Sequence, residues 1–197
     1  MSTRPVVILA RALTLAAAVT STQAVGYELT EAERDVPLEY RHFALQYGIP
    51  YVIFYAVLLA ESGMRDPETG RFRPWPWTLN IGGKEARFGS RDAAAETLRD
   101  TLESGRRNVD IGQAQINYLY NAQMLPRSLY AALDPETNLG VAAGILRREL
   151  RRCATPDWWC AVARYHSPGP STAQRQRAAH YVQRVRRYWV QLVVVEN

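Results

Sequence analysis

The clearest feature of the hydrophobic pattern is a long apolar run with a single acid at its end. Residues 49–60 carry no charged side chain, and Glu61 follows directly. A helix over residues 50–62 would be apolar all round, which predicts burial on every side rather than a position on the surface. Pro50 suits the first turn of this helix, and Gly63 lets the chain leave it. We therefore expect a buried helix that ends at a carboxylate.

Shorter apolar stripes behind capping residues predict further helices. We expect them over residues 38–47, from Ser90 to Gly105, from Asp134 to Leu150, from Asp157 to Tyr165 and from Ser171 through Trp189. Residues 77–88 alternate between apolar and polar around Gly82 and Gly83, which predicts a small hairpin. The final apolar residues, 192–195, fit either core packing or a short strand. Together these elements predict a mostly α (α+β) fold with one small β-hairpin region.

The N-terminal residues 1–24 have the composition of a signal peptide. Arg4 and Arg11 supply positive charge, residues 12–19 form a short apolar core, and small residues precede the cleavage point. The core is too short to span a bilayer, and an uncleaved anchor stays open as the alternative. Residues 25–197 show no repeat or linker and suffice for one buried core. We expect them to form a single periplasmic domain without a stable membrane span.

Composition excludes disorder and narrows the choice of partner. The 197 residues are 47% hydrophobic and 22% charged, which is ordinary for a folded domain. The net charge of +5 suits an anionic partner, with a solvated basic surface as the plainer alternative. An exported protein meets the cell wall before it meets nucleic acid. We therefore expect no nucleic-acid partner, despite the arginine-rich segment 146–153.

The cysteines and histidines indicate structure rather than metal chemistry. Cys153 and Cys160 are the only cysteines, and in an exported chain we expect them to form a disulfide. His42, His166 and His180 lack the spacing of metal ligands, and no phosphate-binding glycine loop is present. We expect neither a metal nor a cofactor.

Glu61 has the setting of a general acid. Apolar surroundings and the negative end of the helix dipole both disfavour its ionised form, so both should raise its pKa. A carboxyl that stays protonated near neutral pH can donate a proton in catalysis. The alternative is a surface glutamate that merely ends a helix.

Four segments in order resemble a known enzyme family. They are AESG (60–63), VDIGQAQIN (109–117), NLGVAAGILRREL (138–150) and AVARYHSPGP (161–170). Together they are similar to the catalytic domain of the soluble lytic transglycosylases, in particular the small secreted branch associated with conjugation and type IV secretion. The resemblance covers about residues 37–189. It implies a lysozyme-like, mostly α fold that cleaves the β-1,4 bond between N-acetylmuramic acid and N-acetylglucosamine in peptidoglycan.

The resemblance also assigns roles to residues. Glu61 matches the single catalytic acid, which protonates the glycosidic oxygen and then accepts the proton of the muramic acid C6 hydroxyl, leaving a 1,6-anhydro end. Tyr165 matches a tyrosine that can hydrogen-bond the acid or the sugar. A small residue at position 112 would let the backbone approach the glycan. The residues expected to bind substrate are Ser62, Gly112, Gln115, Ile116, Asn117 and Tyr165. Glycan strands, and components of an envelope-spanning secretion or conjugation apparatus, are the implied partners.

Two alternatives to a transglycosylase stay open, and departures from the family pattern motivate the first. Residues 113–114 are Gln-Ala where the family has Leu-Met, which would remove bulky side chains from the cleft wall. His166 and Pro168 replace an asparagine and a glycine. These changes favour, as one alternative, a peptidoglycan-binding assembly factor with little turnover on the same fold. The other is a hydrolytic, lysozyme-like muramidase with Asp110 as a second carboxylate, although we expect Asp110 to orient its loop through backbone hydrogen bonds.

Overall fold

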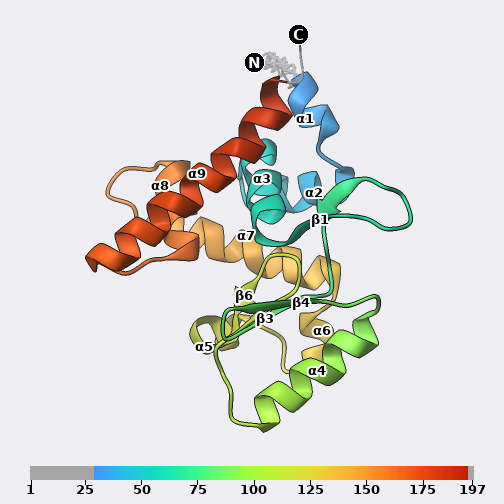
Figure 1. Ribbon diagram of the computed structural model, residues 1–197. Coiled ribbons are helices and arrows are strands. Elements are labelled where there is room, and N and C mark those ends of the chain that lie inside the picture. Colours follow the sequence, from blue (N-terminus) through green and yellow to red (C-terminus); the bar gives the residue numbers. More distant parts are fainter. Residues whose placement is uncertain (1–28, 195–197) are drawn as a thin grey trace, which may run out of the picture.

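The computed structural model describes residues 29–194, so the predicted signal peptide at residues 1–24 lies outside the described part. The described chain is mostly helical with two small antiparallel sheets, which confirms the mostly α (α+β) class. The helical part and the larger sheet form two regions, and α7 (Pro135–Arg151) runs between them (Figure 1).

The helical region is built around the predicted apolar helix, α3 (Tyr51–Ser62). Every side chain of α3 from Val52 to Ala60 is buried, as its all-round apolar sequence predicts. Helix α9 crosses α3 in Figure 1 and packs against it. The other helices of this region are α1 (Glu31–Asp35), α2 (Leu38–Gln46), α8 (Trp158–His166) and α9 (Thr172–Val194). Because α9 continues to Val194, the end of the described chain is helical and not a strand.

The second region is a four-stranded antiparallel sheet in the order β4-β3-β5-β6. Its strands are β3 (Thr78–Ile81), β4 (Lys84–Arg87), β5 (Val109–Ile111) and β6 (Ile116–Asn117). The helices in this region are α4 (Arg91–Glu103), α5 (Tyr118–Asn121) and α6 (Leu129–Ala132), with a 3-10 turn at Ala122–Met124. The predicted hairpin is β3–β4. The segment expected to be a loop, residues 109–117, instead forms β5, a tight turn and β6.

A second sheet follows α3 directly and was not predicted. It pairs β1 (Gly63–Arg65) with β2 (Phe72–Pro74). Each strand has only three residues, too few for alternation to identify it in the sequence.

Capping side chains set the starts of the predicted helices. Ser90, Asp134 and Asp157 each accept a hydrogen bond from a backbone N–H in the first turn of their helix. Ser171 and Gln174 exchange hydrogen bonds at the start of α9, as a capping box does. These local interactions explain why the helix starts could be predicted from sequence.

The predicted disulfide between Cys153 and Cys160 is present and joins the end of α7 to α8, with Cα atoms 6.2 Å apart. Within residues 29–194, no single helix is both long and apolar enough to cross a bilayer. Helices α2 and α3 reach that threshold only as a pair, and they are bent by 116°.

Candidate active site

Glu61 lies in the last turn of α3 and faces a cleft of about 830 Å³. The cleft is lined by residues of both regions and of α7, so it opens where these parts of the molecule meet. Gln115 and Tyr165 line the same cleft. The structure therefore brings together three predicted residues that lie up to 104 positions apart in the sequence.

The Glu61 carboxyl has the electrostatics expected of an acid near neutral pH. Burial raises its pKa from 4.5 to about 7, and the negative charge of Asp110 acts in the same direction. A hydrogen bond from Tyr181 and the positive charge of Arg184 oppose this rise without cancelling it. Near pH 7 a substantial fraction of Glu61 is therefore protonated and able to donate.

Tyr181 on α9 holds the carboxyl in place. Its hydroxyl donates a 2.6 Å hydrogen bond to Oε1 of Glu61, and its side chain is almost fully buried. When Glu61 is protonated, this bond to Oε1 leaves Oε2 to carry the proton. Sequence reasoning did not single out Tyr181, because its apolar spacing on α9 indicates burial but not which distant group it meets.

Two cleft residues hold the Tyr181 ring. The His166 ring is stacked on it, with centroids 4.4 Å apart and planes 6° from parallel, and the Arg184 guanidinium lies 5.2 Å from its centroid. Desolvation and the positive charges of Arg184 and Arg177 lower the pKa of His166 to about 4. His166 is therefore neutral near pH 7. The His166 ring supplies a flat surface for Tyr181 and no additional charge beside Glu61.

Tyr165 does not contact Glu61 by a hydrogen bond. Its hydroxyl donates to the carbonyl oxygen of Ala114 at 2.7 Å, which ties α8 to the turn between β5 and β6. Burial and the negative charges of Glu61 and Asp110 raise the pKa of Tyr165 well above its usual value, so the hydroxyl stays a donor. Tyr165 thus positions the wall of the cleft. The hydrogen bond to the Glu61 carboxyl that was expected from Tyr165 is made by Tyr181 instead.

Ser62 is a structural residue rather than a sugar contact. It is 1% exposed, and its hydroxyl donates to the carbonyl oxygen of Gln113 at 2.6 Å while accepting from the backbone N–H of Trp75 at 3.2 Å. It therefore connects the end of α3 to both sheets. Ser62 is predicted to bind substrate, and the structure places its side chain behind the residues that line the cleft.

Packing and backbone conformation require a glycine at position 112. It is buried at a φ of +77°, in the left-handed region, and a Cβ there would overlap the side-chain amide of Asn138. Asn138 is itself 1% exposed and bonds the backbone on both sides of this turn, at Ile111 and Ala114. Asn138 on α7 therefore holds this turn in place.

The Gln-Ala departure does not change the cleft wall, contrary to expectation. Gln113 is 2% exposed and donates to the carbonyl oxygen of Pro135, and Ala114 is fully buried. Ile116 is 1% exposed and belongs mainly to the core behind the cleft. These side chains support the turn from inside.

Gln115 presents an acceptor to the cleft. Its side-chain nitrogen donates to the carbonyl oxygens of Gly112 at 2.8 Å and Thr78 at 3.2 Å, which uses both amide hydrogens. The amide oxygen is thereby directed away from these carbonyls. Gln115 has a φ of +47° although it is not glycine, which costs energy and is more common at functional sites than elsewhere.

Asp110 lines the cleft as a second carboxylate, held by a side chain rather than by the backbone. The Asn117 amide donates to Asp110 at 2.7 Å and to Asn108 at 2.9 Å. Burial raises the pKa of Asp110, and the bond from Asn117 opposes this. The Asn117 side chain therefore holds Asp110 while its Oδ1 caps α5, and the predicted role of Asp110 in backbone hydrogen bonding does not match its contacts.

In the part of the chain that the structure describes, no three His, Cys, Asp or Glu side chains form a group that could hold a metal ion. The polar side chains that line the open cleft include carboxyls, amides and guanidinium groups. The chain matches no protein-family model, no curated protein and no solved structure.

Proposed function

We propose that this protein is a peptidoglycan lytic transglycosylase with a lysozyme-like arrangement of its helices. The observation that carries the proposal is the carboxyl of Glu61, whose pKa is raised to about 7 at the end of a buried helix and which faces a cleft of about 830 Å³. A cleft of this volume is within the range that accommodates small ligands and sugar units. The ordered motifs around Glu61, Gln115 and Tyr165 support the choice of family.

In the proposed reaction, Glu61 acts first as acid and then as base. Its Oε2 proton passes to the oxygen between the two sugars as that bond breaks. The carboxylate then accepts the proton of the C6 hydroxyl of N-acetylmuramic acid, whose oxygen attacks C1 and closes a 1,6-anhydro ring. The nucleophile belongs to the substrate, so no second carboxylate is needed, in contrast to two-carboxylate glycosidases. Tyr181 keeps Oε1 fixed through both steps.

The contacts of the chain suit these two steps. The Tyr181 hydrogen bond and the charge of Arg184 both favour the ionised carboxyl, so they stabilise Glu61 after it has given up its proton. Burial favours the protonated form before the reaction. Burial and these two contacts act in opposite directions, so the pKa of Glu61 lies between the values that either alone would give. Such a pKa suits a group that must both give and take a proton.

A hydrolytic muramidase is the second candidate, and one observation favours it. Asp110 lines the cleft of Glu61, and its charge raises the pKa of Glu61. A carboxylate in that position could activate water, with a reducing sugar end as the product. The bond from Asn117 to Asp110 favours a positioning role instead.

Cell-wall clearing tests the proposal. Wild-type protein and the Glu61→Gln variant are run on a gel that contains purified peptidoglycan. Clearing by wild type and its loss in the variant are expected, because the amide keeps the shape and cannot donate the proton. Equal clearing would exclude Glu61 as the acid, and binding without clearing by either protein would support the assembly-factor alternative.

The proposed location is the periplasm, after removal of residues 1–24. There the enzyme would open gaps in the wall, in keeping with the implied partnership with a secretion or conjugation apparatus.

A further inference from the structure

Three arginines surround a buried glutamate in the wall of the cleft. Glu149 on α7 is 1% exposed and accepts from Arg148 at 3.0 Å and Arg152 at 2.8 Å through one oxygen, and from Arg164 at 3.1 Å through the other. All four residues line the cleft that contains Glu61. We call Arg148, Arg152 and Arg164 the arginine cluster. It sets three positive charges against one negative charge.

The arginine cluster keeps hydrogen-bond donors that the protein does not use. Every nitrogen of Arg148 already donates a hydrogen bond, since its Nη atoms bond Met124 and Asn121. Arg164 uses only Nε, and Arg152 uses only Nη1, on Glu149. Within residues 29–194, the remaining nitrogens of these two side chains have no hydrogen-bond partner. A guanidinium offers five N–H donors in a planar fork that fits a carboxylate with two bonds.

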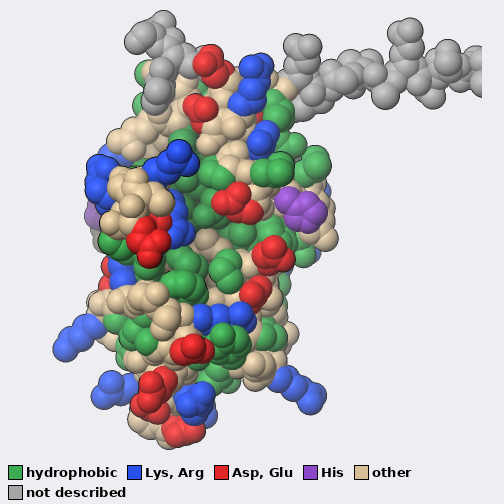
Figure 2. All heavy atoms as spheres, turned by 90° about the vertical axis from the view of Figure 1, so that its right-hand side faces the viewer, with side chains coloured by type: hydrophobic (Ala, Val, Ile, Leu, Met, Phe, Trp, Pro, Cys, Tyr) green, Lys and Arg blue, Asp and Glu red, His purple; other side chains and the backbone are tan. Residues whose placement is uncertain are grey.

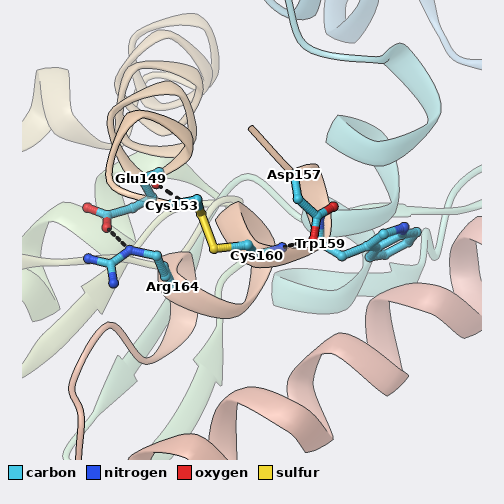
Figure 3. Close-up of a disulfide and its surroundings, with 6 residues drawn as sticks. All are labelled: Glu149, Cys153, Asp157, Trp159, Cys160 and Arg164. Atoms are coloured by element: carbon cyan, nitrogen blue, oxygen red, sulfur yellow. Dashed lines mark hydrogen bonds and ion pairs between the residues drawn. A yellow bond between two sulfur atoms is a disulfide. The ribbon is translucent and has the colours of Figure 1, made fainter. Parts of the chain in front are cut away.

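The disulfide fixes the two underused arginines relative to each other. Cys153 directly follows Arg152 at the end of α7, and Cys160 lies one helical turn before Arg164 on α8. Figure 3 shows the Arg164 side chain beside the Glu149 carboxylate, next to this crosslink. Glu149 and the disulfide thus hold the donors in place before any ligand arrives, which lowers the entropy cost of binding.

One other face of the molecule shows a mixed arrangement of charge. On the face shown in Figure 2, blue and red side chains are interspersed around exposed hydrophobic ones. The arginine cluster, by contrast, concentrates positive charge in a concave site, where charge attracts an anionic ligand more strongly than on an open surface.

We propose that the arginine cluster binds a carboxylate of the stem peptides carried by peptidoglycan, so that the enzyme prefers peptide-substituted glycan over bare glycan. This inference rests on the proposed function, because it takes peptidoglycan as the occupant of the cleft. In peptide-substituted glycan the lactyl carboxyl of each muramic acid is bound in an amide, so the sugars are uncharged and the free carboxylates lie on the attached peptides. A cluster of spare guanidinium donors beside the glycan site is therefore matched to the peptide and not to the sugars.

The test compares three substrates and four proteins. The substrates are intact peptidoglycan, peptidoglycan whose peptides have been removed by an amidase and whose exposed lactyl carboxyls have then been converted to amides, and intact peptidoglycan whose free carboxyls have been converted to amides. The proteins are wild type, Arg152→Gln, Arg164→Gln and the control Arg151→Gln, which changes an exposed arginine on the same helix outside the cleft lining. For each protein we measure the ratio of cleavage rates on intact and modified substrates, and the melting temperature.

Wild type and Arg151→Gln should favour intact peptidoglycan over both modified forms. In Arg152→Gln and Arg164→Gln this ratio should fall by about tenfold or more, the effect of losing a charged hydrogen bond. A wild-type ratio of one, or an unchanged ratio in folded arginine variants, would overturn the proposal. Arg152 is the more exposed of the two, so its variant carries the test if Arg164→Gln fails to fold.

A binding arm separates this inference from the proposed function. The same proteins are sedimented with the three insoluble substrates, in a Glu61→Gln background that removes cleavage. A binding preference for intact peptidoglycan that depends on Arg152 and Arg164 would support the arginine cluster even if wild type cleaved nothing. Binding that ignores the carboxyls, with Glu61-dependent cleavage intact, would reject the cluster and keep the enzyme.

Discussion

Replacing Glu61 by glutamine should stabilise the protein above neutral pH and leave it unchanged in acid. The folded state raises the pKa of Glu61 from 4.5 to about 7. Between these values the folded protein holds a proton that the unfolded chain has released, so wild-type stability falls as pH rises. The glutamine variant cannot lose this proton, and its amide oxygen still accepts from Tyr181.

The magnitude follows from the pKa difference. One pKa unit corresponds to about 1.4 kcal/mol, so above pH 7 the ionised Glu61 costs up to about 3.5 kcal/mol of folding stability. This is an upper limit, since the carboxyl borders an open cleft where solvent screens charge. In a domain of this size, 3.5 kcal/mol corresponds to a shift in melting temperature of about 7–14 °C.

The assay is urea or thermal unfolding of wild type and Glu61→Gln at pH 4.5 and pH 8, with the disulfide intact. Glu103→Gln is the matched control, because Glu103 also ends a helix but is exposed. We expect a stability gain for Glu61→Gln that appears only at pH 8, and no comparable gain for the control. An equal difference at both pH values would refute the reasoning that Glu61 is held neutral by its surroundings.

Three further predictions follow from single contacts. Tyr181→Phe removes the hydrogen bond that favours ionised Glu61. The pH at which kcat/KM declines should therefore move above the wild-type midpoint near pH 7, and kcat should fall roughly tenfold. An unmoved pH profile would argue against the contact. Gly112→Ala should lower the free energy of unfolding by about 2–4 kcal/mol in urea titrations, because the left-handed backbone and the Asn138 amide both oppose a Cβ. A loss below 0.5 kcal/mol would mean that this turn relaxes freely, a threshold set by the scatter of ordinary surface substitutions at about that size. Reducing the disulfide should cost about 2–3 kcal/mol by the same titration, and no change on reduction would contradict its role in fixing α7 to α8.

The sequence predicts those parts of the fold that depend on local interactions. Helix starts at Ser90, Asp134 and Asp157 were predictable because each cap bonds to its own first turn. The buried helix α3 was predictable because no polar face interrupts it. Strands β1 and β2 were missed, since three residues carry too little alternation and their pairing depends on chain that folds back from further on.

The residues of the candidate site likewise fall into those that the sequence predicts and those that only tertiary packing brings together. Glu61 is conspicuous in the sequence because it ends an apolar run. Its partner Tyr181 lies 120 residues away, and only tertiary packing decides that the two meet. For Ser62 and Gly112 the motif indicates that the residue type is important. It does not say whether the residue contacts a ligand or supports the turn.

The sequence also carries a pattern that predicts part of the arginine cluster. Glu149 lies seven residues after Ala142 and three after Leu146, which places it on the apolar stripe of α7. An acid on a buried stripe flanked by arginines predicts a buried ion pair, since an isolated charge there would be too costly. The arginine-rich composition of the segment does not by itself predict this buried ion pair.

Mass analysis of the sugars released from purified peptidoglycan tests the central claim most directly. If Glu61 serves as both acid and base for an attack by the substrate's own hydroxyl, wild type should release muropeptides with 1,6-anhydro ends, each one water lighter than a hydrolytic product, and Glu61→Gln should release none. Reducing ends in the wild-type digest, or anhydro ends from the variant, would contradict the account.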